Sequence, residues 1–577
     1  MGAQPAEADQ WVMDNAVSRK WPLYTRGNIG EVFPEVVLPL TWDLYGQSAE
    51  DGWRDAFIRL GMVATGDFPA DEPKVILGTF GGYGYINASY VRMLGLRAPG
   101  GSIEQIDMQF FGESDAPAYV PRDGDKSRAA TLRLGRTLVR LLRAKDIDVL
   151  DEDRHLVDDW VARQPGAEGS DEQLMAYLRQ LSPLFRQLFA RHAEYTFSVA
   201  LVLGALFDLC VKAGHQDQLV SLLGGIGTVD SAAPSTAMWA LARQATATPE
   251  VDSAFDAGVD GLLERLADVP AAADWVAAYE KFVTDFGSRG PNEWDLGSDP
   301  WEFRPELALA AIDRMRGAED THEPAAQARR LAAERELATE SMRKALNPID
   351  RWQFDKALHA TILYSQARER TKTTVIRAVH EGRRAHHLLA ARCAARGGPD
   401  AAWESCLLTV EEFSHFLDDP GRFADLIASR KALHAKLAGL VPPFIINATV
   451  PPIDTWAQRD TTLTPLVAGA TITGIAGCPG VAKGRAHVVL DASDPRQLGA
   501  GDVLVAPITD PSWTPLFLAA EAVVVDVGAT MSHAVIVSRE LGIPCVVSAV
   551  GATRSIPDGA LIEVDGNAGT VKILELP

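Results

Sequence analysis

The stretch "VGATMSHAVIVSRELGIPCVV", residues 527–547, places a single histidine, His533, directly before an apolar segment. The run "AVVVDVG" at 522–528 is short, apolar and rich in β-branched residues, which predicts a buried strand. Apolar residues recur at helical spacing over 533–541, and either Thr530 or Ser532 is a suitable N-terminal cap. The sequence therefore predicts a strand, a turn and a helix, with His533 in the first turn of the helix.

The first turn of a helix is a favourable place for phosphate chemistry. Unpaired backbone N–H groups and the positive end of the helix dipole bind anions there, and they disfavour the protonated form of an imidazole. His533 is therefore a candidate nucleophile beside a phosphate cradle that includes Thr530 and Ser532. The alternative is an ordinary capping or surface histidine, and this residue alone favours that alternative.

The composition of the chain changes near residue 445. Before it, stretches rich in Ala, Leu, Arg and Glu have apolar residues at three- and four-residue spacing, which predicts helices over 125–165, 171–215, 234–286, 305–345 and 352–397. The motif "PKVILGTFGGYGYINASYV" predicts two short strands around a glycine turn. The apolar stretch 195–211 is slightly short for a membrane span and contains Asp208, so we expect a buried helix there.

A second domain is expected after a linker. Residues 446–471 contain a Pro-Pro pair and several threonines without a sustained period, which is typical of a linker. The remainder alternates short Val- and Ile-rich runs with Gly, Pro and Asp turns. We therefore predict a multidomain α+β protein, with a mainly helical domain and a small β element over 1–445, a linker over 446–471 and a compact β/α domain over 472–577.

The overall composition excludes several classes of protein. The 577 residues have a formal net charge of −22, which would repel nucleic acid and anionic membranes, so neither is an expected partner. Five scattered cysteines argue against a disulfide framework or a zinc site, and the acidic N-terminus lacks a signal-peptide pattern, so we expect a cytoplasmic protein. No metal-ligand spacing occurs, and we expect structural roles for His192, His215, His359, His386 and His387.

The segment around His533 resembles a known family. "MSHAVIVSRELGIPCVV", with "PITDPSWTPLF" before it and "DGALIEVDGNAGTV" after it, is similar to the swivelling phosphohistidine domain of phosphoenolpyruvate-utilising enzymes over about 471–575. The resemblance implies that His533 accepts phosphate at one active site and carries it to another. Family members usually have a Gly-Gly pair where this chain has Val527-Gly528.

A second motif predicts where the phosphate goes. In "SQARERTKTTVIR", Arg368 and Lys372 fall at i and i+4 on one helical face, next to Glu369. Cationic groups stabilise the charge of a moving phosphoryl group, and a carboxylate can accept the proton of an attacking hydroxyl. The motif is similar to the acceptor-site helix of rifampicin phosphotransferase, which implies catalytic roles for all three residues. The alternative is a solvated charged face.

Two further segments resemble rifampicin phosphotransferase and its relatives. They are "YTRGNIGEVFPEVVLPLTWDL" at 24–44 and "FGSRGPNEWDLGSDPWEFRPE" at 286–306, in which polar residues lie between glycines and prolines. The candidates for lining an acceptor pocket are Arg26, Asn28, Glu31, Arg289, Glu293 and Asp295. The alternative for each is structural, because Arg and Glu near glycine turns often form buried ion pairs. Core packing is the ordinary expectation for the aromatic residues Trp42, Phe80, Tyr83 and Trp239.

The source of the phosphate is expected to be another protein. No Walker-type phosphate loop is found, and no stretch resembles the ATP-grasp or phosphoenolpyruvate-binding domains with which relatives phosphorylate their histidine. The resemblance to phenylphosphate synthase implies a separate ATP-grasp subunit that binds ATP and Mg²⁺, with no cofactor bound tightly by this chain. We expect a phosphotransferase subunit that passes phosphate from His533 to the hydroxyl of a phenol or another hydrophobic alcohol. The alternative is a non-catalytic small-molecule-binding or regulatory protein derived from such an enzyme.

Overall fold

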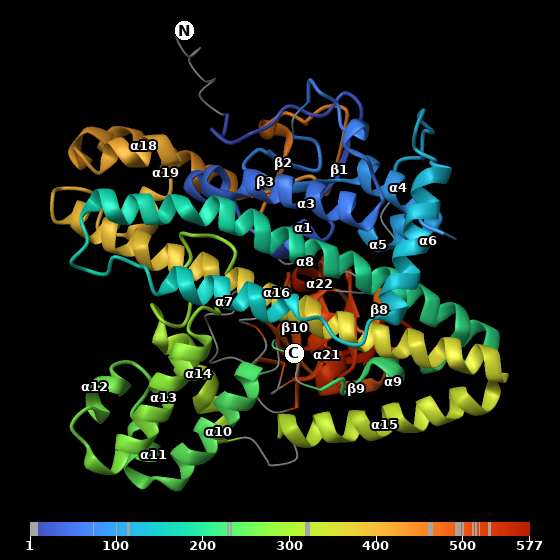
Figure 1. Cartoon of the computed structure of the whole chain (residues 1–577). Coiled ribbons are helices and arrows are strands. Elements are labelled where there is room, and N and C mark those ends of the chain that lie inside the picture. The colour runs from blue at the N-terminus through green and yellow to red at the C-terminus, as the bar shows by residue number, and fades with distance from the viewer. Residues whose placement is uncertain are drawn as a thin grey trace. The chain divides into compact units, whose positions relative to one another are not determined.

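The computed structural model describes residues 10–577 except 73, 100, 112–115, 228–229, 231–232, 318–322, 460–465, 491–497, 499–500, 510–512, 514–515, 518–519 and 529–531 (Figure 1). The chain divides into two compact units. Unit 1 comprises Met1–Gly204, Trp294–Ser298 and His359–Asp460, and unit 2 comprises Ala205–Glu293, Asp299–Leu358 and Thr461–Pro577. Two long helices, α8 (Asp171–Ala213) and α16 (Pro348–Ala394), run through both units. The predicted domain ranges 1–445, 446–471 and 472–577 stay a prediction.

Unit 1 contains a small antiparallel sheet. Its strands lie in the order β2 (Leu77–Phe80), β3 (Tyr83–Asn87), β1 (Leu23–Thr25) and β5 (Ile445–Asn447). The predicted hairpin is confirmed as β2 and β3, joined by Gly81 and Gly82, which both have a positive φ. β5 and the short strand β6 (Ala457–Gln458), which pairs with β4 (Leu440–Val441), use residues of the predicted linker. The first part of that linker is therefore ordered structure.

Helices make up most of the rest of unit 1. They are α1 (Ile29–Val32), α2 (Pro39–Thr41), α3 (Gln47–Leu60), α4 (Ala88–Arg97), α5 (Ile103–Phe111), α6 (Arg128–Arg143), α7 (Val149–Val161), α17 (Ala402–Ser405), α18 (Val410–Phe416) and α19 (Ala424–Ala438), together with the parts of α8 and α16 up to Gly204 and from His359. A π-helical turn, Trp42–Gly46, joins α2 to α3. The unit has one large apolar core, which includes the sheet and the inner faces of α3, α8 and α16.

Helix α8 corrects one expectation. The helix predicted over 195–211 is confirmed, but its burial is wrong for the second half, because Phe207 and Val211 are 42% and 49% exposed. By length and composition alone α8 could cross a membrane, and 28% of its most apolar window is buried. A single helix of this kind is weak evidence for a membrane protein, because core helices of soluble proteins have the same composition.

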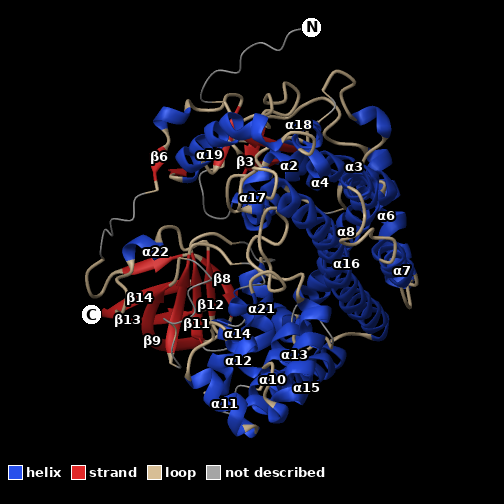
Figure 2. Ribbon diagram, turned by 90° about the vertical axis from the view of Figure 1, so that its left-hand side faces the viewer, coloured by secondary structure: helices blue, strands red, loops and turns tan. Residues whose placement is uncertain are grey.

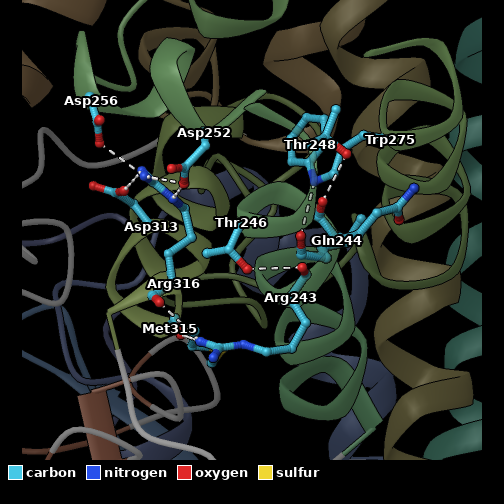
Figure 3. A network of polar contacts seen from close by, with 11 residues as sticks. Arg243, Gln244, Thr246, Thr248, Asp252, Asp256, Trp275, Asp313, Met315 and Arg316 are labelled. Atoms are coloured by element: carbon cyan, nitrogen blue, oxygen red, sulfur yellow. Dashed lines mark hydrogen bonds and ion pairs between the residues drawn. The ribbon is translucent and has the colours of Figure 1, made fainter. Parts of the chain in front are cut away.

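The helical part of unit 2 consists of α9 (Leu219–Leu223), α10 (Ala233–Ala247), α11 (Pro249–Asp256), α12 (Leu262–Leu266), α13 (Ala273–Phe286), α14 (Pro305–Arg316) and α15 (Pro324–Ala345). The predicted stretch 234–286 is thus divided into four helices, because Pro249, Gly258, Gly261 and Pro270 interrupt it. Arg316 joins α14 to α11 through ion pairs with Asp252 and Asp256, at 2.6 and 2.9 Å (Figure 3). Arg243 of α10 donates to the Arg316 carbonyl at 3.1 Å. This polar network is structural support.

The other part of unit 2 is a mixed sheet. Its strands lie in the order β7 (Thr471–Thr473), β14 (Thr570–Glu575), β13 (Leu561–Asp565), β9 (Val481–Val488), β10 (Asp502–Ala506), β11 (Ala520–Val525), β12 (Cys545–Val547) and β8 (Ile475–Cys478), of which β9 to β12 pair in parallel (Figure 2). Alternate strand residues face opposite sides. Val523 and Val525 pack with α21 (His533–Leu541), whereas Ala522 and Val524 pack with α22 (Ala552–Ser555). The predicted strand and helix are confirmed as β11 and α21, with α21 at the predicted residues, and residues 529–531 between them lie outside the described residues.

Candidate functional site

His533 is the first residue of α21. Its Nδ1 lies 3.2 Å from Thr509 Oγ1, a buried hydroxyl just beyond β10, and its ring meets Phe517 edge to face with centroids 5.7 Å apart. The ring is therefore held from two sides but keeps an accessible surface. Thr509 and Phe517 were missed as individual residues, although both lie in the segment "PITDPSWTPLF" that carries the family resemblance.

The turn before α21 explains the departure from the family pattern. A side chain at Gly528 would place its Cβ only 2.9 Å from Val547 Cβ and 3.2 Å from Ser532 Oγ, so this position has no room for one. Val527 is 36% exposed, and its side chain is therefore tolerated. The glycine that the packing requires is thus the one that this chain retains.

Of the two residues predicted to bind phosphate, Thr530 and Ser532, the structure describes only Ser532. Thr530 lies outside the described residues. Ser532 occupies the N-cap position, but its side chain makes no capping hydrogen bond, and its buried Oγ has no partner among the described residues. A buried hydroxyl without a partner is unfavourable. This hydroxyl and the first N–H groups of α21 are polar groups that an anion beside His533 could satisfy.

Arg368, Glu369 and Lys372, which we call the α16 cluster, lie in the middle of α16. Arg368 Nη1 is 3.7 Å from Glu369 Oε1, and their side chains are 20% and 11% exposed. Arg368 Nε is buried without a hydrogen-bond partner among the described residues. This burial argues against a solvated charged face. An unpartnered guanidinium N–H is a suitable donor for a phosphate oxygen.

His192 of α8 lies against the α16 cluster, although the sequence indicated only a structural role for it. Its Nδ1 is 3.2 Å from Thr371 Oγ1 of α16. Burial, together with the positive charges of Arg368 and Lys372, lowers the pKa of His192 to about 3, against a hydrogen bond to the Arg368 backbone that raises it. The imidazole is therefore neutral. No local pattern marks this histidine, because its neighbours come from a distant helix.

Two aromatic rings pack against His192. Its ring centroid is 6.1 Å from Phe189 and 6.2 Å from Trp294, and these two rings are 6.2 Å from each other. Trp294 belongs to one of the segments that resemble rifampicin phosphotransferase, but it was not among the predicted site residues. Unit 1 thus packs aromatic rings against the histidine that contacts Thr371 of α16.

Arg26, Asn28 and Glu31 do not form a group of free polar side chains. Arg26 is buried, and its guanidinium donates to the backbone carbonyls of Gly84 and Phe33 at 2.9 and 3.0 Å. Asn28 is exposed with a φ of 72°, and Glu31 lies in the first turn of α1. Arg26 thus joins strand β3 to the residue that follows α1, and a binding role for Arg26, Asn28 and Glu31 stays a prediction.

The second segment contains a buried ion pair. Arg289 Nε lies 2.7 Å from Glu293 Oε2, and both side chains are at most 3% exposed. Asp295 accepts hydrogen bonds from Thr41 Oγ1 at 2.7 Å and from the Gly297 N–H at 3.0 Å, and burial raises its pKa. These geometries agree with the structural alternative, and pocket-lining roles stay a prediction. The aromatic residues Trp42, Phe80, Tyr83 and Trp239 are all buried in the cores.

The remaining titratable groups indicate no metal centre in the described part of the chain. No group of three or more His, Cys, Asp or Glu side chains there could hold a metal ion. His386, which is fully buried, lies 2.9 Å from Ser405 Oγ, and burial lowers its pKa to about 3. It is a structural histidine on the same helix as the α16 cluster.

Two family models match this chain. "Rifampicin phosphotransferase fourth domain" matches residues 191–369, which include His192, Arg368 and Glu369 and end just before Lys372. "PEP-utilising enzyme, mobile domain" matches residues 498–569, which include His533 and Thr509. The two matches therefore contain both regions of interest.

Several curated proteins are similar to the chain. An uncharacterised protein of Mycobacterium tuberculosis is 31% identical over 296 residues, covering 51% of this chain and 31% of that protein. A rifampicin phosphotransferase of Streptomyces sviceus is 31% identical over 331 residues, covering 56% and 37%. A prodigiosin-synthesising transferase of Serratia marcescens is 29% identical over 314 residues, covering 53% and 34%. The matched region thus spans about a third of the length of these relatives.

The family models and the relatives agree with the resemblance seen in the motifs. Over the matched residues the chain resembles PEP-utilising enzymes, and rifampicin phosphotransferase in particular.

Proposed function

We propose that this chain is a phosphotransferase subunit that carries a phosphoryl group on His533 to a hydroxyl group of a small organic acceptor. The observation that carries the proposal is the position of His533, the first residue of α21, inside the matched mobile domain with its Nδ1 beside Thr509 Oγ1. If Thr509 accepts the Nδ1–H hydrogen bond, the lone pair of Nε2 is the nucleophile. The relatives named as phosphotransferases support the reaction class.

In the first half-reaction, His533 Nε2 attacks the donor phosphorus. The N–P bond forms as the bond from phosphorus to the donor oxygen breaks, and the proton on Nδ1 stays in its hydrogen bond with Thr509. We propose that the donor is a separate ATP-grasp protein, which binds ATP with Mg²⁺. Ser532 and the first N–H groups of α21 would bind the oxygens of the phosphoryl group.

In the second half-reaction, the acceptor hydroxyl attacks the phosphoryl group at the α16 cluster. The P–O bond forms as the N–P bond breaks, which returns neutral His533 because Nδ1 keeps its proton. Arg368 and Lys372 would stabilise the charge on the phosphoryl oxygens, and Glu369 would accept the hydroxyl proton. The rings of Phe189 and Trp294, which pack against His192, favour an aromatic or otherwise hydrophobic acceptor, such as a phenol.

The first experiment separates the carrier step from any partner. Potassium phosphoramidate, a small chemical donor of phosphoryl groups to histidine, is incubated with the protein, and the intact mass is measured at alkaline pH. We expect the gain of one phosphoryl group that His533→Ala does not acquire. A candidate ATP-grasp protein with ATP and Mg²⁺ then replaces phosphoramidate.

The second experiment follows discharge of the loaded protein. 2-Naphthol and rifampicin serve as acceptor probes, and the phosphorylated product is identified by mass. Loss of the phosphoryl group with formation of a phosphate ester supports transfer. Equal loading of wild type and His533→Ala would overturn the carrier role, and loading without ester formation on any hydroxyl probe would favour the binding or regulatory alternative.

A further inference from the structure

Helix α6 of unit 1 is strongly basic in an acidic chain. The segment from Lys126 to Lys145 contains seven Lys or Arg residues and no Asp or Glu, whereas the whole chain has a net charge of −22. Arg133 donates to the Gly61 carbonyl at 3.0 Å. Within the described part of the chain, no carboxylate pairs with the exposed cations Lys126, Arg128, Arg136, Arg140 and Arg143.

The exposed face of α6 also carries apolar side chains. The inner face of the helix is buried through Ala130, Leu134, Thr137 and Leu141, so the core already has its contacts. On the opposite face Leu132 and Val139 are 60% and 46% exposed, two turns apart. They line a hollow of about 810 Å³ together with Leu96 and Gly135, and Lys126 and Arg136 also lie at it.

Gly135 stands between Leu132 and Val139 on this face. A glycine in a helix interior is unfavourable relative to alanine, so it needs a reason. Packing among the described residues gives none, because a Cβ at Gly135 would meet no atom of them within 4 Å. The remaining reason is the close approach of a second backbone from outside, as occurs where helices pack at glycine.

We propose that the outward face of α6 is a docking surface for an acidic amphipathic helix of a separate protein. The partner helix would cross α6 at Gly135, place apolar side chains against Leu132 and Val139, and direct Asp or Glu side chains to Arg128, Arg136 and Arg143. Opposite charges on two such faces speed association and exclude partners of the wrong sign. This inference concerns binding alone and stands without the proposed phosphoryl transfer.

Two other anionic partners fit the surface less well. A membrane-bound helix needs a broad apolar face, usually with aromatic residues, whereas α6 exposes two aliphatic side chains and has no aromatic residue. Nucleic acid has no apolar side chain for the hollow, and the chain's overall negative charge repels its phosphates.

The experiment measures binding of a labelled 18-residue peptide helix with three leucines on one face and glutamates elsewhere. We expect binding to the full chain that weakens as salt rises, because the charges screen each other. Peptides with the leucines changed to serine, or the glutamates to glutamine, are the matched controls and should bind at least about tenfold more weakly. A double-stranded DNA oligomer and phosphatidylserine vesicles are tested in parallel.

Variants of the protein then locate the surface. Gly135→Arg and Leu132→Asp should each weaken peptide binding at least about tenfold, because a side chain blocks close approach or a charge enters the apolar contact. Gly135→Ala should raise the midpoint of thermal unfolding, since alanine favours the helix and meets no atom. Thermal unfolding confirms that each variant is folded.

The outcomes are distinct. Binding that requires both the leucines and Gly135 supports the proposal. Equal binding to wild type and Leu132→Asp, tighter binding of DNA or vesicles than of the peptide, or no binding of the peptide at low salt would each overturn it.

Discussion

His533 stands at the first residue of α21, whereas Arg368, Glu369 and Lys372 stand in the middle of α16. At the start of a helix, backbone N–H groups are unpaired and are available to an anion. In the middle of a helix they are not, so side chains must supply every donor. The α16 cluster accordingly depends on long cationic side chains and on neighbours from α8, while His533 lies among the unpaired N–H groups at the start of its own helix.

The largest expected effect is that of Lys372→Ala, which should separate the α16 cluster from the His533 region by slowing only one of the two steps. Lys372→Ala should slow discharge of phosphorylated His533 to an acceptor by about 10²–10³-fold, which is typical when a donor to the transition-state charge is removed. Loading of His533 by phosphoramidate should be unchanged, since the role proposed for Lys372 belongs to the second half-reaction alone. Single-turnover discharge, followed by intact mass, measures both steps.

The control for Lys372→Ala is Lys431→Ala, at an exposed lysine of unit 1 that pairs with Glu404. It removes the same side chain far from the α16 cluster in sequence, and we expect normal discharge. Slowed loading in Lys372→Ala would contradict the separation of the two steps.

A pH experiment probes two histidines, His192, which contacts α16, and His386, which is part of α16. His192 and His386 have folded pKa values of about 3, below the unfolded value near 6.5, so the unfolded state binds the extra protons. Their contribution to stability is complete above pH 6.5 and is lost as the pH falls toward 3. For His386, which is fully buried, the slope approaches about 1.4 kcal/mol per pH unit.

Urea unfolding of wild type and His386→Gln between pH 7.5 and 5 checks this prediction. The variant should be less stable at pH 7.5 but should lose less stability on acidification. Parallel pH profiles of the two proteins would show that the pKa of His386 does not change on unfolding.

At the other region, Thr509→Val should slow both half-reactions by about tenfold, the effect of one hydrogen bond worth about 1.4 kcal/mol. In the proposed mechanism His533 takes part in both steps, and Thr509 Oγ1 is 3.2 Å from its Nδ1. Thr509→Ser retains the hydroxyl and is the matched control. A variant that slowed discharge alone would assign Thr509 to the acceptor step.

The smallest effect concerns Ser532. Its Oγ has no partner among the described residues, so Ser532→Ala should change the free energy of unfolding by less than about 1 kcal/mol. This change is smaller than the usual cost of removing an N-cap side chain that makes its hydrogen bond. Loading should slow if the hydroxyl serves the phosphoryl group. Calorimetry and the loading rate together distinguish a phosphate-binding serine from a structural cap.

The two regions also differ in how far the sequence predicts them. The residues 533–541 of α21 are correct because strand, turn, cap and helix are neighbours in the sequence. The sequence does not predict the neighbours of the α16 cluster. His192 and Trp294 come from elsewhere in the chain and have no motif of their own. The roles of Arg289 and Glu293 stayed open for a different reason. These residues are only four positions apart, but the sequence does not show that their ion pair is buried.

The division of the chain has a consequence for its genetics. Each unit is assembled from three separated stretches of sequence, and the junctions fall inside α8 and α16 as well as in loops. No single break in the gene, including one at residue 445, separates them into two intact folding units. A recombination event that exchanged one unit with a relative would need several matched crossovers, so the two halves of this protein are expected to be inherited together.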